Sequence, residues 1–387
     1  MQKLGLLGST GSIGSYALEV VDFLKDRFQV YGLSANRNIP RLQQQIEKFH
    51  PRVVVVGDES QYPHIKKRFP KRDMKILAGV DGMCELAGDD EVDIVLNAAV
   101  GSVGLLPTLE AIKKGKRMAL ANKETIVAFG SVLMEEAKRN RAQIIPVDSE
   151  HSAIHQCLGE RNANNLKRIV LTASGGPFLG ATEEEIRSAS KESVLAHPVW
   201  RMGKKVTVDS ATLMNKGFEV IEAHFLFGIP LEKIDVLVHP QAIIHSMVEF
   251  EDGCMLAQIS TPDMRMPIQY ALTYPERFPS IVSPCNLTKI GKLEFKDVDM
   301  NRFPCLSLGY KAIEKDGTAT AVLSGADEMA VKLFLDGQLR FKDIPFILNK
   351  ILDEYQPISS PTLQQLIEEE RWARQYTKKL VERWSSQ

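Results

Sequence analysis

Short apolar runs alternate with amphipathic stretches in the first part of the chain. The apolar runs predict strands at Leu4–Leu7, Val30–Leu33, Val53–Val56, Ile76–Leu77, Asp93–Ala98, Met118–Ala121 and Ile144–Val147. The stretches between them have the period of amphipathic helices, which we expect at Ile13–Leu24, Pro40–Phe49, Gln61–Phe69, Gly104–Lys114 and Thr125–Asn140. Because strands alternate with helices, the pattern predicts a parallel, doubly wound sheet.

The pattern changes in the middle of the chain. We expect, in order, a strand, a long polar segment, a helix and the two strands of a hairpin, at Ile169–Ala173, 174–204, 209–222, Ile243–Phe250 and Cys254–Ile259. Asp252-Gly253 joins the last two runs, and glycine supplies the positive φ of a tight turn. This region therefore predicts an antiparallel or mixed sheet. Irregular, proline-marked chain over 261–304 then leads to helices expected at Leu306–Glu314, Ala326–Leu335, Asp343–Tyr355 and Thr362–Trp384.

Composition narrows the class of protein. The 387 residues are 44% hydrophobic and 25% charged, which is typical of a soluble globular chain with two or three domains. With 48 basic and 49 acidic residues the net charge is −1, so there is no overall field for a nucleic acid, and we expect none as partner. The five cysteines lie far apart and show no metal-binding spacing. Without a signal segment or a long apolar run, the sequence predicts a cytoplasmic protein with no membrane partner.

A glycine-rich segment directly follows the first predicted strand. Gly8, Gly11 and Gly14 are spaced by three and open onto a predicted helix. Backbone without Cβ atoms can approach a pyrophosphate, whose charge then lies against free N–H groups and the positive end of the helix dipole. The spacing departs from the usual dinucleotide fingerprint, so a purely structural turn is the alternative interpretation.

The end of the second predicted strand indicates which dinucleotide binds. An acidic residue there would hold two ribose hydroxyls, but the chain instead has Asn36-Arg37-Asn38. A guanidinium flanked by amides suits a 2′-phosphate and favours NADP over NAD. The alternative is a surface turn with an incidental arginine. A second candidate lies after the strand Met118–Ala121, where Asn122 and Glu124 could contact the nicotinamide half and Lys123 could contact a substrate oxygen or point to solvent.

Two groups of carboxylates suggest a metal. In extended chain after the strand Ile144–Val147, Asp148 and Glu150 would share one face, and such close like charges need a proton or a cation between them. Oxygen ligands favour Mg²⁺ or Mn²⁺. Helix capping by Asp148 or Ser149 is the alternative.

The predicted helix 209–222 has two distinct faces. Met214, Phe218, Ile221 and Phe225 recur at helical spacing and should be core. The other side carries polar residues, of which Ser210, Asn215 and Lys216 could donate to a phosphate and Glu219 could be a third metal ligand. Periodicity alone favours an exposed polar face that also contains Glu222.

The polar segment 174–204 is long for a loop in a compact protein and predicts a lid. Trp200 and Met202 could close over a ligand, with His197 adding a hydrogen bond. For Trp200, ordinary core packing is an equal alternative.

Together these motifs resemble those of the 1-deoxy-D-xylulose 5-phosphate reductoisomerase family. The resemblance is ordered, runs essentially end to end, and rests on Gly8–Gly14, Ala121–Glu124, Val147–His151, Ser174–Phe178, His197–Gly203, Asn215–Glu219, His239–Gln241 and Ile244–Met247. It implies an enzyme, an NADP-dependent oxidoreductase that converts 1-deoxy-D-xylulose 5-phosphate to 2-C-methyl-D-erythritol 4-phosphate, in the non-mevalonate route to isoprenoid precursors. It also implies NADPH, one Mg²⁺ or Mn²⁺ per active site, and a homodimer.

The resemblance assigns roles residue by residue. The metal ligands are expected to be Asp148, Glu150 and Glu219. The substrate contacts are expected to be Lys123, Ser149, Glu150, Ser174, His197, Trp200, Ser210, Asn215, Lys216 and Glu219, of which Ser174, Ser210, Asn215 and Lys216 contact the phosphate. The catalytic set is expected to be Lys123, Asp148, Glu150, His197 and Glu219. The cofactor contacts are expected to be Thr10, Gly11, Ser12, Ile13, Asn36, Arg37, Asn38, Asn122, Glu124 and Gly203. Asn36 stands where many members carry glycine.

The expected fold is α/β and has three parts joined by one linker. An N-terminal Rossmann-like domain with a doubly wound sheet covers 1–149, and a central α+β catalytic and dimerisation domain covers 150–273, with its lid at about 174–204. A linker covers 274–303 and a C-terminal helical bundle covers 304–387. Two other functions remain open on the residues alone: an NADP dehydrogenase acting on a phosphorylated aldehyde, and a dinucleotide-sensing regulator. Neither needs three carboxylates around one cation.

Overall fold

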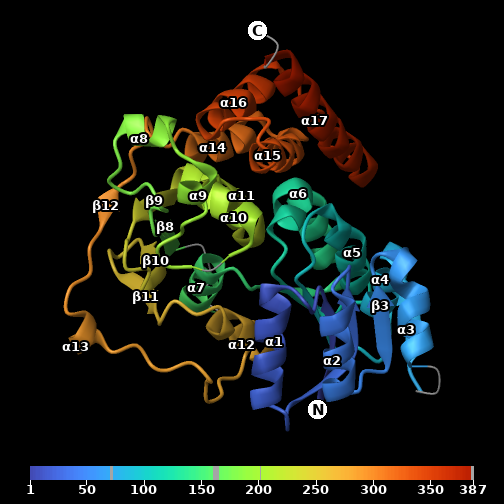
Figure 1. Ribbon diagram of the computed structural model, residues 1–387. Coiled ribbons are helices and arrows are strands. Elements are labelled where there is room, and N and C mark those ends of the chain that lie inside the picture. The colour runs from blue at the N-terminus through green and yellow to red at the C-terminus, as the bar shows by residue number, and fades with distance from the viewer. Residues whose placement is uncertain (70–72, 160–164, 201, 385–387) are drawn as a thin grey trace. The chain divides into compact units, whose positions relative to one another are not determined.

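The computed structural model describes residues 1–69, 73–159, 165–200 and 202–384, and it contains two compact units (Figure 1). Unit 1 comprises Met1–Thr125, Leu133–His155 and Asp263–Ser283; unit 2 comprises Ile126–Val132, Gln156–Pro262 and Pro284–Gln387. Arg201, part of the predicted lid, lies outside the described residues. The three-part domain division expected from the sequence stays a prediction.

Unit 1 contains a seven-stranded sheet in the order β4-β3-β2-β1-β5-β6-β7, with every pairing parallel. Its strands are β1 (Gln2–Leu7), β2 (Phe28–Ala35), β3 (Val53–Val56), β4 (Lys75–Ala78), β5 (Ile94–Asn97), β6 (Arg117–Leu120) and β7 (Gln143–Pro146). All seven coincide with predicted strands. The chain order reverses between β1 and β5, and ligands of such sheets bind at the carboxyl ends of the strands beside this reversal.

The helices of unit 1 include three that the sequence did not predict. Predicted and found are α1 (Ser12–Phe23), α2 (Ile39–Phe49), α3 (Tyr62–Arg68), α5 (Leu105–Lys113) and α6 (Lys123–Asn140); not predicted were α4 (Gly79–Gly88), α7 (Ser149–Leu158) and α12 (Arg265–Thr273). The helices α6 and α7 each continue from one unit into the other. The expectation of irregular chain from residue 261 was wrong for α12, because Pro267 lies in the first helical turn, where its missing N–H costs nothing.

The core of unit 1 forms between the sheet and its helices. Leu4, Leu6 and Leu33 are completely buried there, and Ile268 of α12 joins the same cluster. The apolar face of α12 explains why Asp263–Ser283 return to unit 1 after the chain has entered unit 2.

Unit 2 is built on a mixed sheet, as predicted. Its strands are β8 (Leu166–Ala173), β9 (Ile234–Val238), β10 (Ile244–Phe250), β11 (Met255–Ile259) and β12 (Lys296–Asp297), in the order β11-β10-β8-β9-β12. Only the β8–β9 pairing is parallel among those described. The predicted hairpin is β10–β11, and Gly253 has a φ of 82° in its turn.

The helices of unit 2 fall into three groups along the chain (Figure 1). The predicted lid contains α8 (Glu183–Arg187) and α9 (Lys191–Val194); α10 (Lys204–Thr212) and α11 (Met214–Phe227) follow; α14 (Cys305–Lys315), α15 (Ala319–Leu335), α16 (Ile344–Glu354) and α17 (Leu363–Trp384) form the predicted helical bundle, after the short α13 (Leu287–Ile290). No described helix has the length and apolar character needed to cross a bilayer.

The single helix expected over 209–222 is in fact two helices. Leu213 has a φ of 58° and ends α10, and α11 begins at the next residue. Asp209 therefore lies inside α10 and does not begin a helix. Leucine in the left-handed region is uncommon, so sequence rules gave no reason to place a break there.

Candidate functional site

The glycine-rich segment forms the turn between β1 and α1. Gly8 has a φ of 81°, and a Cβ atom on it would lie 2.6 Å from the carbonyl oxygen of Ala98. A Cβ atom on Gly14 would lie 2.3 Å from the carbonyl oxygen of Gly8. Gly11 is the exposed N-cap of α1, and none of the described side chains caps this helix end. The N-terminus of α1 therefore has no side-chain cap among the described residues, and an anion could accept from its first-turn N–H groups.

Two polar residues that the sequence analysis did not identify hold this turn. The N–H of Gly8 donates to Oγ of Ser34 at 3.0 Å. Oγ of Ser9 donates to Oε1 of Gln45 at 2.7 Å, and Nε2 of Gln45 donates back to the carbonyl of Ser9 at 2.9 Å. Ser34 interrupts an apolar strand, which was the available signal for its role.

The residues expected at the adenosine end lie exposed after β2. The Arg37 side chain is 81% exposed, and its Nε lies 3.1 Å from Oδ2 of Asp58. The hydroxyl and N–H of Ser60 donate to Asp58 and hold the pKa of that carboxyl below its usual range. Oδ1 of Asn38 accepts from the N–H of Arg41 at 3.3 Å and caps α2, while Asn36 is exposed. An exposed guanidinium with one side anchored suits a phosphate that arrives from solvent.

Asn122 has a structural task at the end of β6. Its Oδ1 accepts from the N–H of Thr125 at 2.8 Å and caps α6, and its Nδ2 donates to the carbonyl of Gly101 at 2.9 Å. These bonds fix the loop after β5 beside the start of α6, where Lys123 and Glu124 lie half-buried.

Asp148 caps α7, which corrects the extended geometry expected for this segment. Oδ1 of Asp148 accepts from the N–H groups of Glu150 and His151 at 3.0 and 3.3 Å. Glu150 therefore lies in the first turn of a helix, because the cap interaction of Asp148 overrides continuation of the strand. The alternative interpretation, helix capping, is confirmed. Oγ of Ser149 donates to Oε2 of Glu150 at 2.6 Å.

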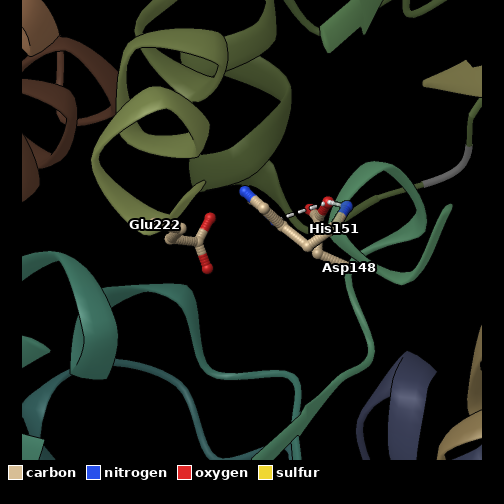
Figure 2. A group of neighbouring side chains, drawn as sticks. All are labelled: Asp148, His151 and Glu222. Carbon is tan, nitrogen blue, oxygen red and sulfur yellow. Dashed lines mark hydrogen bonds and ion pairs between the residues drawn. The ribbon is translucent and has the colours of Figure 1, made fainter. Parts of the chain in front are cut away.

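An ammonium and an imidazole lie beside the Asp148 carboxylate within unit 1. Nζ of Lys123 donates to its Oδ2 at 3.2 Å. Nδ1 of the fully buried His151 lies 3.0 Å from its Oδ1, and dashed lines in Figure 2 join these two residues. His151 was not among the expected site residues, although it directly follows Glu150 in the sequence. The structure thus brings Lys123 and Asp148 together, as their shared expected site requires.

In unit 2, His197 has a defined tautomer. Its Nδ1 accepts from the N–H groups of Val199 and Trp200 at 3.2 and 2.9 Å. The proton of the neutral ring is therefore on Nε2, which lies 3.3 Å from Oγ of Ser174. Burial lowers the pKa of His197, which favours the neutral ring. Trp200 is half-buried, and its ring centroid lies 6.2 Å from that of His245.

The charged residues Lys216, Glu219 and Glu222 of α11 are buried and Asn215 is half-buried, so the exposed face expected from periodicity was wrong. Lys216, Glu219 and Glu222 are 5%, 1% and 4% exposed. The helix packs against β8 and β9 and against α10 and α14, which leaves these positions no solvent face. The core positions Met214, Phe218 and Ile221 are buried as predicted, and Phe225 is half-buried.

These polar groups bind one another. Nζ of Lys216 donates to the carbonyl of Thr172 at 2.5 Å and forms an ion pair with Glu219. Nδ2 of Asn215 donates to Oε1 of Glu219 at 2.5 Å, and Oδ1 of Asn215 is buried without a partner among the described residues. A buried ammonium and an unsatisfied amide at a helix N-terminus are suited to an anion such as phosphate.

The turn after β8 packs on the end of α10. Gly176 has a φ of 66°, and a Cβ atom there would lie 2.7 Å from the carbonyl oxygen of Ser210. Since Lys216 reaches the end of β8 through Thr172, the turn that contains Ser174, the end of α10 and the start of α11 meet at one strand end. The four residues expected to bind phosphate therefore gather in unit 2, whereas Gly203 is the exposed N-cap of α10.

Comparison with known proteins identifies the family. Three family models match: 1-deoxy-D-xylulose 5-phosphate reductoisomerase over residues 4–130, its C-terminal domain over 144–227, and the DXP reductoisomerase C-terminal domain over 259–376. The 1-deoxy-D-xylulose 5-phosphate reductoisomerase of Thermodesulfovibrio yellowstonii is 48% identical over 381 residues, which cover 98% of this chain and 100% of that protein. The chain belongs to the 1-deoxy-D-xylulose 5-phosphate reductoisomerase family.

Solved reductoisomerases share the fold. The enzyme from Zymomonas mobilis in complex with NADPH has a TM-score of 0.93 and 40% identity, covering 98% of this chain and 99% of that one. A reductoisomerase in complex with NADPH, fosmidomycin and magnesium has a TM-score of 0.94 and 35% identity, covering 99% of this chain and 98% of that one. The predicted family and fold class are thereby confirmed.

Three residues that were not predicted from the sequence support the residues expected to bind ligands in this family. Ser34, Gln45 and His151 each hold a backbone or carboxylate group next to an expected ligand contact, without being an expected contact themselves. A motif does not reveal such a supporting role, because the fold determines which polar group the side chain reaches.

Proposed function

We propose that this chain catalyses the NADPH- and metal-dependent conversion of 1-deoxy-D-xylulose 5-phosphate to 2-C-methyl-D-erythritol 4-phosphate, a step in the non-mevalonate route to isoprenoid precursors. The observation that carries the proposal is the 48% identity to a reductoisomerase over 98% of the chain. The cofactors predicted from the sequence agree with it, since one solved relative is a complex with NADPH and another contains magnesium.

Asp148, Glu150 and Glu219 would hold one divalent cation. This set of carboxylates could bind a metal, and so could the set Asp148, His151 and Glu222, which Figure 2 draws. We favour the first set because ligands that are all oxygen suit Mg²⁺ and Mn²⁺. His151 then serves as the group that orients Asp148. When bound, the cation supplies Lewis-acid stabilisation of charge that develops on substrate oxygens.

The NADPH contacts would divide between the two ends of the cofactor. Thr10, Gly11, Ser12 and Ile13 at the start of α1 would bind the pyrophosphate, and Arg37 with Asn36 and Asn38 the 2′-phosphate. The nicotinamide half would lie against Asn122, Glu124 and Gly203. NADPH supplies the hydride of the reduction.

The remaining residues would bind and orient the sugar phosphate. Ser174, Ser210, Asn215 and Lys216 would hold its phosphate, far from the reacting carbons, which converts binding energy into orientation. Neutral His197 would donate from Nε2, while Lys123 and Ser149 would contact substrate oxygens. The segment 174–204, with Trp200, would close over the site and exclude water.

The proposal also includes the oligomeric state, the location and the domain boundaries. We propose a homodimer, a cytoplasmic location, and the division into domains 1–149, 150–273 and 304–387 joined by a linker at 274–303. The compact units do not follow this division, because Asp263–Ser283, which contain α12, belong to unit 1. Functional domains need not coincide with compact units.

The decisive experiment measures loss of NADPH absorbance with 1-deoxy-D-xylulose 5-phosphate after chelator treatment, with and without Mg²⁺ or Mn²⁺. We expect turnover only when substrate and metal are both present. Turnover that survives thorough metal removal would contradict the proposal and favour a plain dehydrogenase. NADPH binding without any oxidation would favour a sensor.

A matched pair of variants separates the two carboxylate sets. Asp148 is common to both, so the informative changes are Glu219→Gln and Glu222→Gln. We expect Glu219→Gln to lower kcat by about 100-fold or more, because a lost ligand removes several kcal/mol of charge stabilisation, and to weaken Mn²⁺ binding. Glu222→Gln should keep kcat and the affinity for Mn²⁺ within about tenfold of the wild-type values. The reverse ranking would assign the metal to the set that contains His151.

A further inference from the structure

A buried ionic cluster in unit 2 has no role in the function proposed above. Nζ of Lys205 on α10 lies 2.6 Å from Oδ2 of Asp209 and 2.9 Å from Oδ2 of Asp327. The two aspartates are 1% and 0% exposed, and the same ammonium lies 4.5 Å from the centroid of the Phe218 ring. Burying charges in this way costs solvation, so a hydrophobic contact would give comparable stability at less cost. The cluster is therefore better explained by the positions in which it holds its helices than by added stability.

The cluster connects two helices. Asp327 belongs to α15, whose residues from Ala319 to Asp327 are all buried. Lys205 and Asp209 belong to α10, whose first residue is exposed and five of whose nine residues, Asp209 among them, are buried. Through Lys205, α15 is thus joined to α10.

The position of α10 determines where the expected phosphate contacts lie. Ser210 directly follows Asp209, and its carbonyl oxygen lies against the turn at Gly176, where a Cβ atom would be 2.7 Å from it. Oγ1 of Thr212 donates to the carbonyl of Asp209 at 3.1 Å and accepts from the N–H of Met214 at 3.2 Å, at the first residue of α11. A movement of α10 would therefore displace Ser210 and disturb both neighbouring segments that carry expected phosphate contacts.

We infer that Asp327 is a positioning residue for the phosphate pocket, which it maintains by holding α10 through Lys205. The inference rests on the proposed function for the identity of the ligand, a sugar phosphate. Asp327 acts on Ser210 through the helix α10 that carries Ser210, and we expect it to make no contact with the substrate.

Charge and position predict opposite results for one substitution. Asp327→Asn removes a buried negative charge and leaves Lys205 paired with Asp209. If Asp327 influenced phosphate only through its charge, the dianion would bind more tightly to the variant. If Asp327 positions Ser210, phosphate binds more weakly. The direction of the change therefore separates the two explanations.

The test compares Asp327→Asn with the wild-type protein by calorimetric binding of inorganic phosphate and by steady-state kinetics. We expect the Kd for phosphate and the KM for the sugar phosphate to rise about tenfold, as for partial loss of one charge-assisted hydrogen bond. The values of kcat and of KM for NADPH should change less than about twofold. Unchanged or tighter phosphate binding would overturn the inference.

The matched control is Glu328→Gln, one residue further along α15. It also removes a carboxylate, but Glu328 pairs with Arg374 and not with α10, so phosphate binding should not change. If Asp327→Asn does not fold, as judged by circular dichroism, Lys205→Gln breaks the same connection from the α10 side and should also weaken phosphate binding. The two proposals fail separately, because calorimetry needs no turnover. A wild-type protein without activity would contradict the proposed function. Unaltered phosphate affinity in the variants would contradict the positioning role of Asp327.

Discussion

Two cation–carboxylate pairs of the candidate site differ in their surroundings. In unit 1, Arg37 and Asp58 form a pair with side chains 81% and 24% exposed. In unit 2, Lys216 and Glu219 form a pair with side chains 6% and 1% exposed. The chemistry of the pairs is the same, but water screens the first and is excluded from the second.

This difference explains what each pair can do. An exposed pair contributes little to stability and can rearrange when a charged ligand arrives, which suits selection between similar cofactors. A buried pair holds its partners in one geometry, and loss of either leaves an uncompensated charge. The comparison therefore predicts that Arg37 contributes to cofactor recognition and not to the stability of the fold. Lys216 should contribute both to the stability of the fold and to ligand binding.

The largest effect should come from Lys216→Met. The change leaves Glu219 buried without its ammonium partner and should lower the free energy of unfolding by about 3–5 kcal/mol. Chemical denaturation of chelator-treated protein measures it. The control is Lys48→Met, which breaks the exposed pair with Asp22 (57% and 52% exposed) and should change stability by less than about 0.5 kcal/mol. Equal losses in the two variants would remove the distinction between the pairs.

A smaller and more selective effect is expected for Arg37→Ala. The loss of charge-assisted hydrogen bonds to a 2′-phosphate should reduce kcat/KM for NADPH by about 10- to 100-fold, since such bonds contribute about 1.5–3 kcal/mol. Turnover with NADH should stay within about twofold and the unfolding midpoint should not move. Equal losses with both cofactors would contradict the assigned role.

The smallest effect concerns pH and His197. Because burial lowers its pKa, the neutral ring persists below the ordinary histidine pKa of about 6.5. As the pH falls through this range, the unfolded chain takes up its proton before the folded protein does, so this group's contribution to stability is present above the range and lost below it. We expect the acid limb of kcat/KM to titrate below pH 6.5 or so. A limb that His197→Gln leaves unchanged would assign the titration to another group.

The sequence predicted the parallel sheet well because each strand is a compact apolar run and needs no distant partner to be recognised. It did not predict α12, because the prolines of 261–304 indicated irregular chain, or the break at Leu213, which no local preference favours. Both depend on packing between segments that are distant in the chain, which local propensity does not describe.

At the candidate site, the sequence identified residue types better than their environments. Glu219 and Lys216 were recognised through a motif, yet periodicity predicted an exposed face, because it cannot show that a second layer covers the polar side of α11. Asp148 was expected in extended chain, although it caps a helix. Polar groups that work through the backbone, such as Gln45, were not identified at all.

The turn between β1 and α1 also sets limits for engineering of the cofactor preference. Randomised libraries could vary Gly11, where a Cβ atom would make only an ordinary contact of 3.5 Å, but Gly8 and Gly14 would have to be kept because any side chain there collides with main-chain atoms. Sequence variation at this turn is thus restricted to positions such as Gly11 that a nucleotide would touch. Gly8 and Gly14 cannot vary, for steric reasons alone.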